Sequence, residues 1–279
     1  MILSMENLTA CKLYGEKKSA KMFKDAGFDA FDFSYYYLEQ TEGRQEAVLG
    51  ENYREFAKDL REYINSIGII CNQAHAPFDL TFEDELDESN ITFLRLARSI
   101  ESAAILGAEI IVIHSYDVPE GKDLIEENVK MYKAFAPYAK KSGIKIGVEN
   151  LMNFGTPEAL NELMNILNDD VFVSCIDLGH SALNNVEPED FLRGVDASRI
   201  GCIHVSDNNY KYDDHLPPYF GSFNWDNITK ALKDIDYNGD FTLEVFEFND
   251  NLIKPDIYPI ALEMNEKIGR KLIKMVEES

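Results

Sequence analysis

The sequence predicts an α/β fold, namely a (β/α)8 TIM barrel formed by a single domain that spans residues 1–279. Eight short runs of apolar and β-branched residues alternate along the chain with longer stretches whose apolar residues recur at helical spacing. The length of 279 residues suits one such barrel, which commonly takes about 250 residues. The alternation indicates parallel strands that are covered on the outside by helices.

An open, doubly wound sheet is the alternative arrangement for alternating strands and helices. That fold usually carries a glycine-rich phosphate-binding turn after its first strand. This chain has no GxGxxG motif there and no GxxxxGK[ST] motif anywhere, and the Gly-Glu-Lys-Lys stretch at residues 15–18 has a different spacing. The strand count therefore favours the barrel.

The strands are expected where apolar, β-branched residues cluster. They are Ile2–Met5, Phe28–Phe33, Ile69–His75, Ile110–His114, Lys145–Glu149, Val171–Asp177, Ile200–Ser206 and Phe241–Val245. Amphipathic helices are expected between them, where one apolar face can pack on the sheet. They include Glu51–Ser66, Ser89–Leu106, Glu126–Lys141, Pro157–Leu167, Asp226–Asp234 and Ile257–Val276.

Glycine residues mark the expected helix ends. Each lies after a helical stretch and just before a strand, where a backbone with positive φ stops the helix. They are Gly27, Gly68, Gly107, Gly143 and Gly239. At the other end of a helix, Thr156 and Pro157 have the pattern of an N-cap residue followed by proline at the first helical position.

Composition excludes several classes of protein. With 27 Lys and Arg against 50 Asp and Glu, the formal net charge is −23, which argues against nucleic acid or an anionic membrane as a partner. No apolar run approaches the roughly 18 to 20 residues of a membrane span. The first residues also lack a basic segment followed by an apolar stretch, so a cytoplasmic protein is expected.

Ionisable residues stand at or just beyond the ends of the predicted strands. A barrel brings these strand ends together on one face, where active sites of this fold lie. The residues are His75, His114, Glu149, Asp177, His180, His204, Asp213, His215 and Glu244, which include all 5 histidines of the chain. One histidine there would most simply be a hydrogen-bonded loop residue, but the whole set indicates a functional site.

Four of these residues, from four consecutive strands, suggest a metal site: Glu149, Asp177, His204 and Glu244. Three carboxylates this close together would repel one another and raise each other's pKa values unless a cation lay between them. The oxygen-rich donor set suits one divalent ion, with Mn2+ as the first choice and Mg2+, Co2+ or Zn2+ as the others.

The motifs around these residues resemble the xylose isomerase-like TIM barrel family, which contains sugar isomerases and epimerases, inosose dehydratases and endonuclease IV. The matching segments are residues 75–78 (HAPF), 146–150 (IGVEN), 176–180 (IDLGH), 204–208 (HVSDN), 213–218 (DDHLPP), 221 with 224–225 (G and NW) and 243–244 (LE). They span most of the chain. Each motif is weak alone, but their order and spacing are specific.

The resemblance implies roles for individual residues. In the sugar-processing members, the positions of Glu149, Asp177, His204 and Glu244 hold one metal ion, and the two glutamates exchange protons with the substrate. The substrate-binding residues would be His75, His114, His180, Asp213, His215 and Trp225. Aromatic residues near strand ends, namely Tyr35, Tyr36, Phe78 and Trp225, could exclude water, although ordinary packing explains them equally well.

We therefore expect a metal-dependent isomerase or epimerase of a sugar or related polyol ketone. Glu149 and Glu244 would transfer a proton on opposite faces of the substrate, through a metal-stabilised enediolate. An inosose dehydratase, or another carbohydrate lyase of the same fold, would use the same residues and stays an alternative. Relatives are commonly dimers or tetramers, and some act within larger enzymes.

Two positions depart from the ketose 3-epimerase pattern, and a third departs from the segment that is usual in the wider family. Those enzymes have a second glutamate six residues after the first metal ligand and an arginine six residues after the ligand histidine, where this chain has Gly155 and Tyr210. After the motif at residues 213–218, a glycine is replaced by Tyr219. A ketose 3-epimerase activity is therefore doubtful.

A zinc-dependent abasic-site nuclease of the endonuclease IV type is the alternative hypothesis, because all nine of its zinc-ligand positions match the strand-end residues. The loops that would meet DNA are acidic, however, with only Arg44 as a cation against Glu39, Glu42, Glu46, Asp79, Glu83, Asp84, Glu85, Asp87 and Glu88.

Only Lys211 and Lys254 stand in the loops where a sugar phosphate would bind. A small carbohydrate without phosphate is therefore the expected partner.

Overall fold

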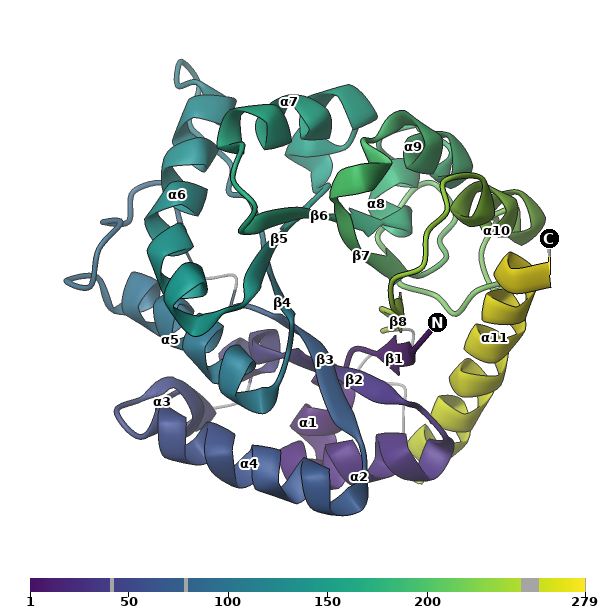
Figure 1. Cartoon of the computed structure of the whole chain (residues 1–279), viewed down its shortest axis with the longest axis horizontal. Helices are drawn as coiled ribbons and strands as arrows, with labels where there is room; N and C mark the ends of the chain where they lie inside the picture. The colour runs from purple at the N-terminus through teal and green to yellow at the C-terminus, as the bar shows by residue number, and fades with distance from the viewer. Residues whose placement is uncertain (41–42, 78–79, 247–255, 279) are drawn as a thin grey trace.

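The computed structural model describes residues 1–40, 43–77, 80–246 and 256–278. Its eight strands form one parallel sheet in the order β1-β8-β7-β6-β5-β4-β3-β2. The strands are β1 (Leu3–Met5), β2 (Ala30–Ser34), β3 (Ile70–His75), β4 (Ile110–Ile113), β5 (Lys145–Glu149), β6 (Phe172–Asp177), β7 (Ile200–Val205) and β8 (Phe241–Leu243). The expected (β/α)8 barrel is confirmed, with every predicted strand present, and Figure 1 shows the strands as a central ring.

Helices surround the ring of strands (Figure 1). They are α1 (Leu8–Tyr14), α2 (Glu16–Ala26), α3 (Arg44–Leu49), α4 (Tyr53–Ile67), α5 (Ile91–Leu106), α6 (Leu124–Ser142), α7 (Pro157–Leu167), α8 (Leu178–Leu183), α9 (Pro188–Gly194), α10 (Trp225–Asp234) and α11 (Tyr258–Glu278), with short 3-10 helices η1 (Tyr35–Gln40), η2 (Met152–Phe154) and η3 (Ala197–Arg199). None of the helices in the described ranges is long and apolar enough to cross a membrane.

Four of the five glycines predicted to end helices do so. Gly27, Gly68, Gly107 and Gly143 have φ between 71° and 102° and cap α2, α4, α5 and α6. The prediction for Gly239 is wrong, because the left-handed residue after α10 is Asp236, with φ 53°. The Thr156 hydroxyl caps α7 by accepting a hydrogen bond from the Ala159 amide at 3.3 Å, as predicted.

Apolar side chains fill the layer between the sheet and the helices. The barrel interior is narrow and contains both apolar and polar side chains. Inside it, Val112, Cys175 and Cys202 form a small separate cluster. Gly147 of β5 lets its neighbours approach, because a Cβ at this position would lie 3.1 Å from the Val112 side chain. Larger polar side chains, including Gln73 and Thr242, are fully or almost fully buried above this cluster, toward the strand ends.

The barrel closes between β1 and β2 through few contacts. Beyond the strands, Glu6 and Asp32 form a single parallel bridge, and the Asn7 amide donates to the Asp32 carbonyl at 3.0 Å. The Asn7 side-chain oxygen accepts a hydrogen bond from the Ser34 amide at 3.2 Å. At the other end of this seam, the Asp29 carboxylate accepts from the Leu3 amide at 2.9 Å.

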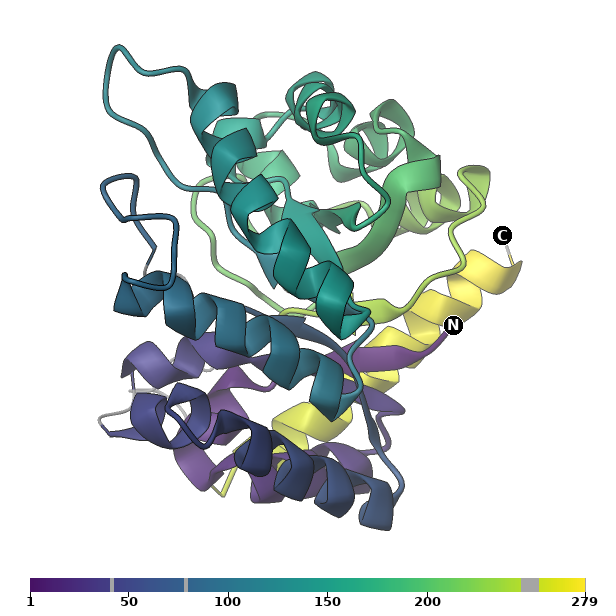
Figure 2. The same ribbon diagram turned by 60° about the vertical axis from the view of Figure 1, so that its left-hand side comes forward.

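The last helix holds the same region from outside. Arg270 of α11 forms an ion pair with Asp29 at 2.7 Å, next to the seam. The amino group of Met1 lies 3.4 Å from the carboxylate of Glu277, so the start and the end of the chain are side by side. Figures 1 and 2 show α11, in yellow, beside β1.

Replacing Asn7 by alanine tests the closing contact. The buried Ser34 amide would lose its acceptor, so the Asn7→Ala variant should lose about 1 to 3 kcal/mol of unfolding free energy in urea. Asn52, which precedes α4 and makes no side-chain cap hydrogen bond, provides the control. The Asn52→Ala variant should stay within about 0.5 kcal/mol of the wild type. Equal effects of the two substitutions would contradict the importance of the seam.

Candidate active site and metal centre

The barrel brings the nine strand-end residues predicted for the site into one cluster. His75, Glu149 and Asp177 are the last residues of β3, β5 and β6, and His204 lies in β7. His114 and Glu244 directly follow β4 and β8, His180 belongs to α8, and Asp213 and His215 come from the loop after β7. Most of these side chains are almost completely buried, so their charges must be compensated by one another or by a bound cation.

Glu149 is the central carboxylate of the cluster. Its Oε2 lies 2.6 Å from Nε2 of His114, and its Oε1 lies 3.0 Å from Nδ1 of His204. The His75 ring is also near, with Nε2 3.7 Å from Glu149 Oε2. Burial alone would raise the pKa of Glu149, but the charges and hydrogen bonds of His114 and His204 outweigh this effect and lower it well below its ordinary value.

The four predicted metal ligands converge. Glu244 Oε2 lies 3.0 Å from Nδ1 of His204, the same nitrogen that faces Glu149. Ligand atoms from Glu149, Asp177, His204 and Glu244 all lie within 4.8 Å of one another, and all four residues are buried. The pKa of Glu244 is lowered because nearby imidazoles, chiefly His204, outweigh the effect of burial.

Asp177 shows that this group fits a cation. Its Oδ2 is buried and has no hydrogen-bond partner in the protein. Burial, together with the negative charges of Glu244 and Glu149, raises the pKa of Asp177 to about 7, although the charge of His180 acts in the opposite direction. A carboxylate oxygen that is held among other carboxylates without a donor is costly to ionise, and a divalent cation would remove this cost.

The backbone holds Asp177 firmly in place. Its Oδ1 accepts a hydrogen bond from the His180 amide at 2.6 Å and caps the start of α8, which begins directly after β6. Asn150, next to Glu149, accepts from the Asp177 amide at 2.6 Å and donates to the Asp177 carbonyl at 2.9 Å. The two acidic strand ends are thus fixed relative to each other.

Two further groups adjoin the four-residue set. His75, His114 and Glu149 form one of them, and His180, Asp213 and His215 form the other. In the second group, Asp213 Oδ2 lies 3.2 Å from His180 Nε2 and 3.1 Å from His215 Nε2. Although burial opposes it, Asp213 and the other acids raise the pKa values of His180 to about 10 and of His215 to about 9.

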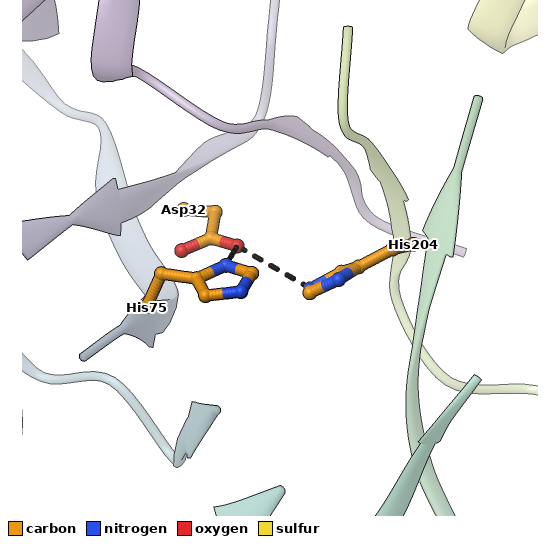
Figure 3. A group of neighbouring side chains, drawn as sticks. All are labelled: Asp32, His75 and His204. Atoms are coloured by element: carbon orange, nitrogen blue, oxygen red, sulfur yellow. Dashed lines mark ion pairs between the residues drawn. The ribbon is translucent and has the colours of Figure 1, made fainter. Parts of the chain in front are cut away.

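Two site residues were not predicted, and they lie on the side of His75 and His204 that faces the barrel interior. Asp32 of β2 has Oδ2 3.8 Å from His75 Nδ1 and 3.7 Å from His204 Nε2, as Figure 3 shows. Gln73 donates to this oxygen at 2.7 Å. A signal was available, since Asp32 is an acid between two phenylalanines on a strand and Gln73 stands two residues before His75, on the same face.

A third unpredicted residue, the acid Glu6, follows β1 and is almost fully buried. Burial, with a further contribution from the negative charge of Glu244, raises the pKa of Glu6 to about 8. The site therefore contains the carboxyl groups of Asp32 and Glu6 in addition to the three carboxylates among the predicted metal ligands.

Trp225 has different surroundings from the other predicted substrate-binding residues. It is 2% exposed, and its indole N–H donates to Asp207 at 2.9 Å. Its ring packs near Tyr219 and Phe223. These contacts give Trp225 a supporting position under the loop after β7, so its substrate-binding role stays a prediction.

The other aromatic residues proposed to wall off the site behave as packing residues where they are described. Tyr35 is fully buried and donates its hydroxyl to Ser102 of α5 at 2.7 Å. Tyr36 packs partly buried against the hydrophobic core. Phe78 lies outside the described residues, as do Glu42, Asp79 and Lys254, and so does the side chain of Glu39.

The two departures from the ketose 3-epimerase pattern, Gly155 and Tyr210, have structural counterparts. Gly155 lies after η2, where a Cβ would meet the Asn184 side chain at 1.8 Å, so the backbone and Asn184 fill this space. Tyr210 donates its hydroxyl to Glu187 at 2.7 Å, ahead of α9, and its ring packs against Phe223. The Tyr210 hydroxyl thus bonds to the residue that precedes α9.

The chain belongs to the xylose isomerase-like TIM barrel family, whose description matches residues 21–268. An uncharacterised protein of Methanocaldococcus jannaschii is 30% identical over 212 residues, which cover 71% of this chain and 72% of that protein. A "Probable ketose 3-epimerase" of Synechocystis is 28% identical over 244 residues, or 82% of this chain and 79% of its own length.

Solved structures show the same fold. A D-tagatose 3-epimerase-like protein superimposes with a TM-score of 0.76 at 24% identity, covering 100% of this chain and 99% of its own. The IOLI protein, which was solved with a zinc atom bound, gives a TM-score of 0.72 at 20% identity with coverages of 100% and 99%. At these identities the likeness extends to the fold alone.

Asp177→Asn should stabilise the protein in the presence of a chelator. Because the fold raises the pKa of Asp177, ionising this carboxyl group lowers the free energy of unfolding. This loss grows as the pH rises from the ordinary pKa of 3.8 to the folded-state pKa of about 7. In urea with EDTA, the variant should gain about 1 to 3 kcal/mol at roughly pH 8 and less at roughly pH 5.

The exposed Asp170 provides the matched control. Its asparagine variant should change stability by less than about 0.5 kcal/mol at either pH. An Asp177→Asn protein that is less stable than the wild type at the higher pH would show that Asp177 is already compensated within the protein.

Proposed function

We propose that the chain is a divalent-metal-dependent isomerase or epimerase that acts on a sugar or a related polyol ketone. The observation that carries the proposal is the placement of two buried glutamates, Glu149 and Glu244, which come from different strands and each lie 3.0 Å from Nδ1 of His204. Asp177 completes the set with a carboxylate oxygen that has no other partner.

Glu149, Asp177, His204 and Glu244 would hold the cation, for which Mn2+ is our first choice and Mg2+, Co2+ or Zn2+ the alternatives. When bound, such an ion acts as a Lewis acid that draws electron density from a substrate carbonyl and acidifies the neighbouring carbon. The protein supplies the proton carriers and excludes water from them.

The two glutamates are suited to remove and return a proton. Both have lowered pKa values, because neighbouring imidazoles outweigh the effect of burial, so both are ionised at neutral pH and either can act as the base. The glutamate that returns a proton to the other face must first take one up from solvent, and it is left ionised again after the transfer. They belong to β5 and β8, which lie apart in the sheet, so they can approach a substrate from different sides. Epimerisation requires this placement, because the proton must return to the opposite face.

Histidines of the outer group would bind the substrate hydroxyls. The pKa values of His180 and His215, at about 10 and 9, keep both rings protonated at neutral pH. His180 Nδ1 has no hydrogen-bond partner in the protein and can donate to a substrate oxygen, whereas His215 Nδ1 lies 3.1 Å from the Glu244 carbonyl oxygen and donates to it. Asp213 lies between them and accepts from both. His75 and His114 would line the other side of the same pocket, next to Glu149.

The charge around the site favours a neutral carbohydrate. Glu83, Glu85, Asp87 and Glu88 are exposed in the loop before α5. Lys122, a cation in the loop after β4, lies over the Phe82 ring at 5.5 Å. A small uncharged substrate avoids the repulsion that this acidic loop would exert on phosphate groups.

The names of the relatives support carbohydrate chemistry, while two positions argue against a ketose 3-epimerase. The Synechocystis protein carries that name, and the D-tagatose 3-epimerase-like protein shares the fold. Gly155 and Tyr210, however, replace the glutamate and arginine of that enzyme pattern. An isomerase, a different epimerase or an inosose dehydratase fits the same proton carriers.

Solvent exchange tests the proposal. The Mn2+-loaded protein, incubated with a panel of ketoses and inososes in D2O, should incorporate deuterium at a carbon beside the carbonyl group. Glu149→Gln and Glu244→Gln should each lower the rate by about 100-fold or more, because each removes a proton carrier. Mass spectrometry and NMR of the recovered sugar provide the measurement.

Glu162→Gln, on the exposed face of α7, is the control and should keep the wild-type rate. The difference between the two site variants also identifies which carboxylate removes the proton. Absence of exchange, isomerisation and dehydration across the whole panel would reject the proposed function.

A zinc-dependent abasic-site nuclease is the second candidate, and one observation favours it. Among the described residues, the nine strand-end residues include three adjoining groups, two of which share Glu149, that could each hold an ion. Zinc sites with bound water can attack a phosphodiester, and adjacent ions can hold both its oxygens. The acidic loop before α5 argues against this candidate, because it would repel DNA.

Metal content separates the two candidates. The sugar-processing proposal expects one ion for each chain after loading with Mn2+ or Zn2+ and dialysis, measured by elemental analysis. Three firmly bound zinc ions, together with cleavage of an abasic duplex at low salt, would favour the nuclease. Intact duplex after incubation with three equivalents of zinc would remove that candidate.

A further inference from the structure

A cavity of about 490 Å3 lies beside His114, at the edge of the cluster of strand-end residues. Its walls come from residues 80–83 in the loop before α5 and from residues 114–119 after β4. Figure 2 shows these two loops projecting on the same side of the barrel. The volume falls within the range of roughly 300 to 1,000 Å3 that is typical of small-molecule sites.

His114 connects this cavity to the proposed catalytic groups. Its Nε2 lies 2.6 Å from Oε2 of Glu149. The His114 side chain is nevertheless 21% exposed, whereas the side chains of His75 and His204 are completely buried. The cluster is therefore accessible from the cavity along His114, and a sugar bound at Glu149 can extend into the cavity without leaving the site.

The walls combine aromatic rings with acceptors for hydroxyl groups. The rings of Phe82 and Tyr116 meet edge to face, with centroids 6.1 Å apart, and each wall carries an exposed carboxylate, Glu83 or Asp117. An aromatic face attracts the weakly positive C–H groups of a sugar ring, while carboxylates accept hydrogen bonds from its hydroxyls. Lys122, 5.5 Å from the centre of the Phe82 ring, adds a donor. Two carboxylates against this ammonium group favour a neutral ligand over an anion.

Both walls are held by hydrogen bonds to the helices behind them. The Thr81 amide donates to the Asp84 carboxylate at 2.7 Å, and Asp84 also accepts from Asn90, the N-cap residue of α5, at 2.7 Å. The Tyr116 amide donates to the side chain of Asn128 in α6 at 3.0 Å, and the Asn128 amino group donates back to the Tyr116 carbonyl at 3.0 Å. The cavity is thus preformed, so a ligand orders little of either loop when it binds.

We propose that this cavity is a second sugar subsite, so that the substrate is a ketose that carries another sugar ring. The reacting ketose lies at Glu149 and Glu244. The second ring lies beyond His114, against Phe82 and Tyr116, where it takes no part in the proton transfer but adds binding energy that selects substrates of this size. This inference rests on the proposed function, because it places the reacting ring at the two glutamates.

Binding of matched one-ring and two-ring sugars tests the inference. Turanose, maltulose, lactulose and isomaltulose are fructose units that carry a second ring on different hydroxyl groups. In calorimetric titrations of the Mn2+-loaded protein, at least one of them should bind about 10-fold more tightly than fructose. Phe82→Ala should remove most of this preference, because it deletes an aromatic ring that the second sugar contacts.

Tyr63 of α4 provides the matched control. It is a partly buried aromatic residue with Lys17 over its ring at 5.6 Å, and it lies outside the cavity. Tyr63→Ala should keep the wild-type preference for the two-ring sugar. Thermal unfolding shows that both variants are folded before they are titrated. Full retention of the preference in a folded Phe82→Ala protein would overturn the subsite.

Deuterium exchange in D2O separates a failure of this inference from a failure of the proposed function. A wild-type protein that exchanges deuterium into a single-ring ketose, but binds all four two-ring sugars no more tightly than fructose, would overturn the subsite alone. A preference for a two-ring sugar without any exchange would support the subsite and reject the proton transfer. Binding of none of these sugars, together with no exchange, would reject both.

Discussion

The structure depends on how Glu149 is compensated. This carboxylate is completely buried at the end of β5, where its two oxygens meet His114 and His204 at 2.6 and 3.0 Å. An isolated charge in this position would be very costly, so the imidazoles of neighbouring strands must lie where they do. The rest of the site follows from this arrangement, since Glu244 and the outer histidines are placed around the same rings.

The outer and inner faces of the barrel strands have different surroundings. The helices and the outer faces of the strands form a large apolar core, which accounts for the fold and is insensitive to the chemistry inside. The interior contains hydrogen-bonded polar residues below the site and a small cluster that includes Cys175 and Cys202. The apolar core and the polar site therefore lie on opposite faces of the same strands.

Sequence patterns predicted the strands well because all eight lie in apolar β-rich runs, and the family follows from motifs at their ends. Short elements such as α8 were missed, because its six residues begin directly after Asp177 and have no helical period of their own. Asp32 and Gln73 were missed for another reason, namely that they lie inside strands and away from the strand ends, where a barrel site is usually sought. Their closeness to His75 and His204 depends on how the barrel closes, which no local pattern reveals.

The seam between β1 and β2 links the completion of the fold to the completion of the site. Every other pair of adjacent strands is joined by a ladder, so this seam, where Glu6 and Asn7 meet Asp32 and Ser34, is the place where the ring has the fewest backbone hydrogen bonds. Asp32 belongs both to this seam and to the surroundings of His75 and His204. A ligand that binds only when this seam is closed would stabilise the closed barrel by mass action. Occupation of the site would therefore strengthen the fold that forms it.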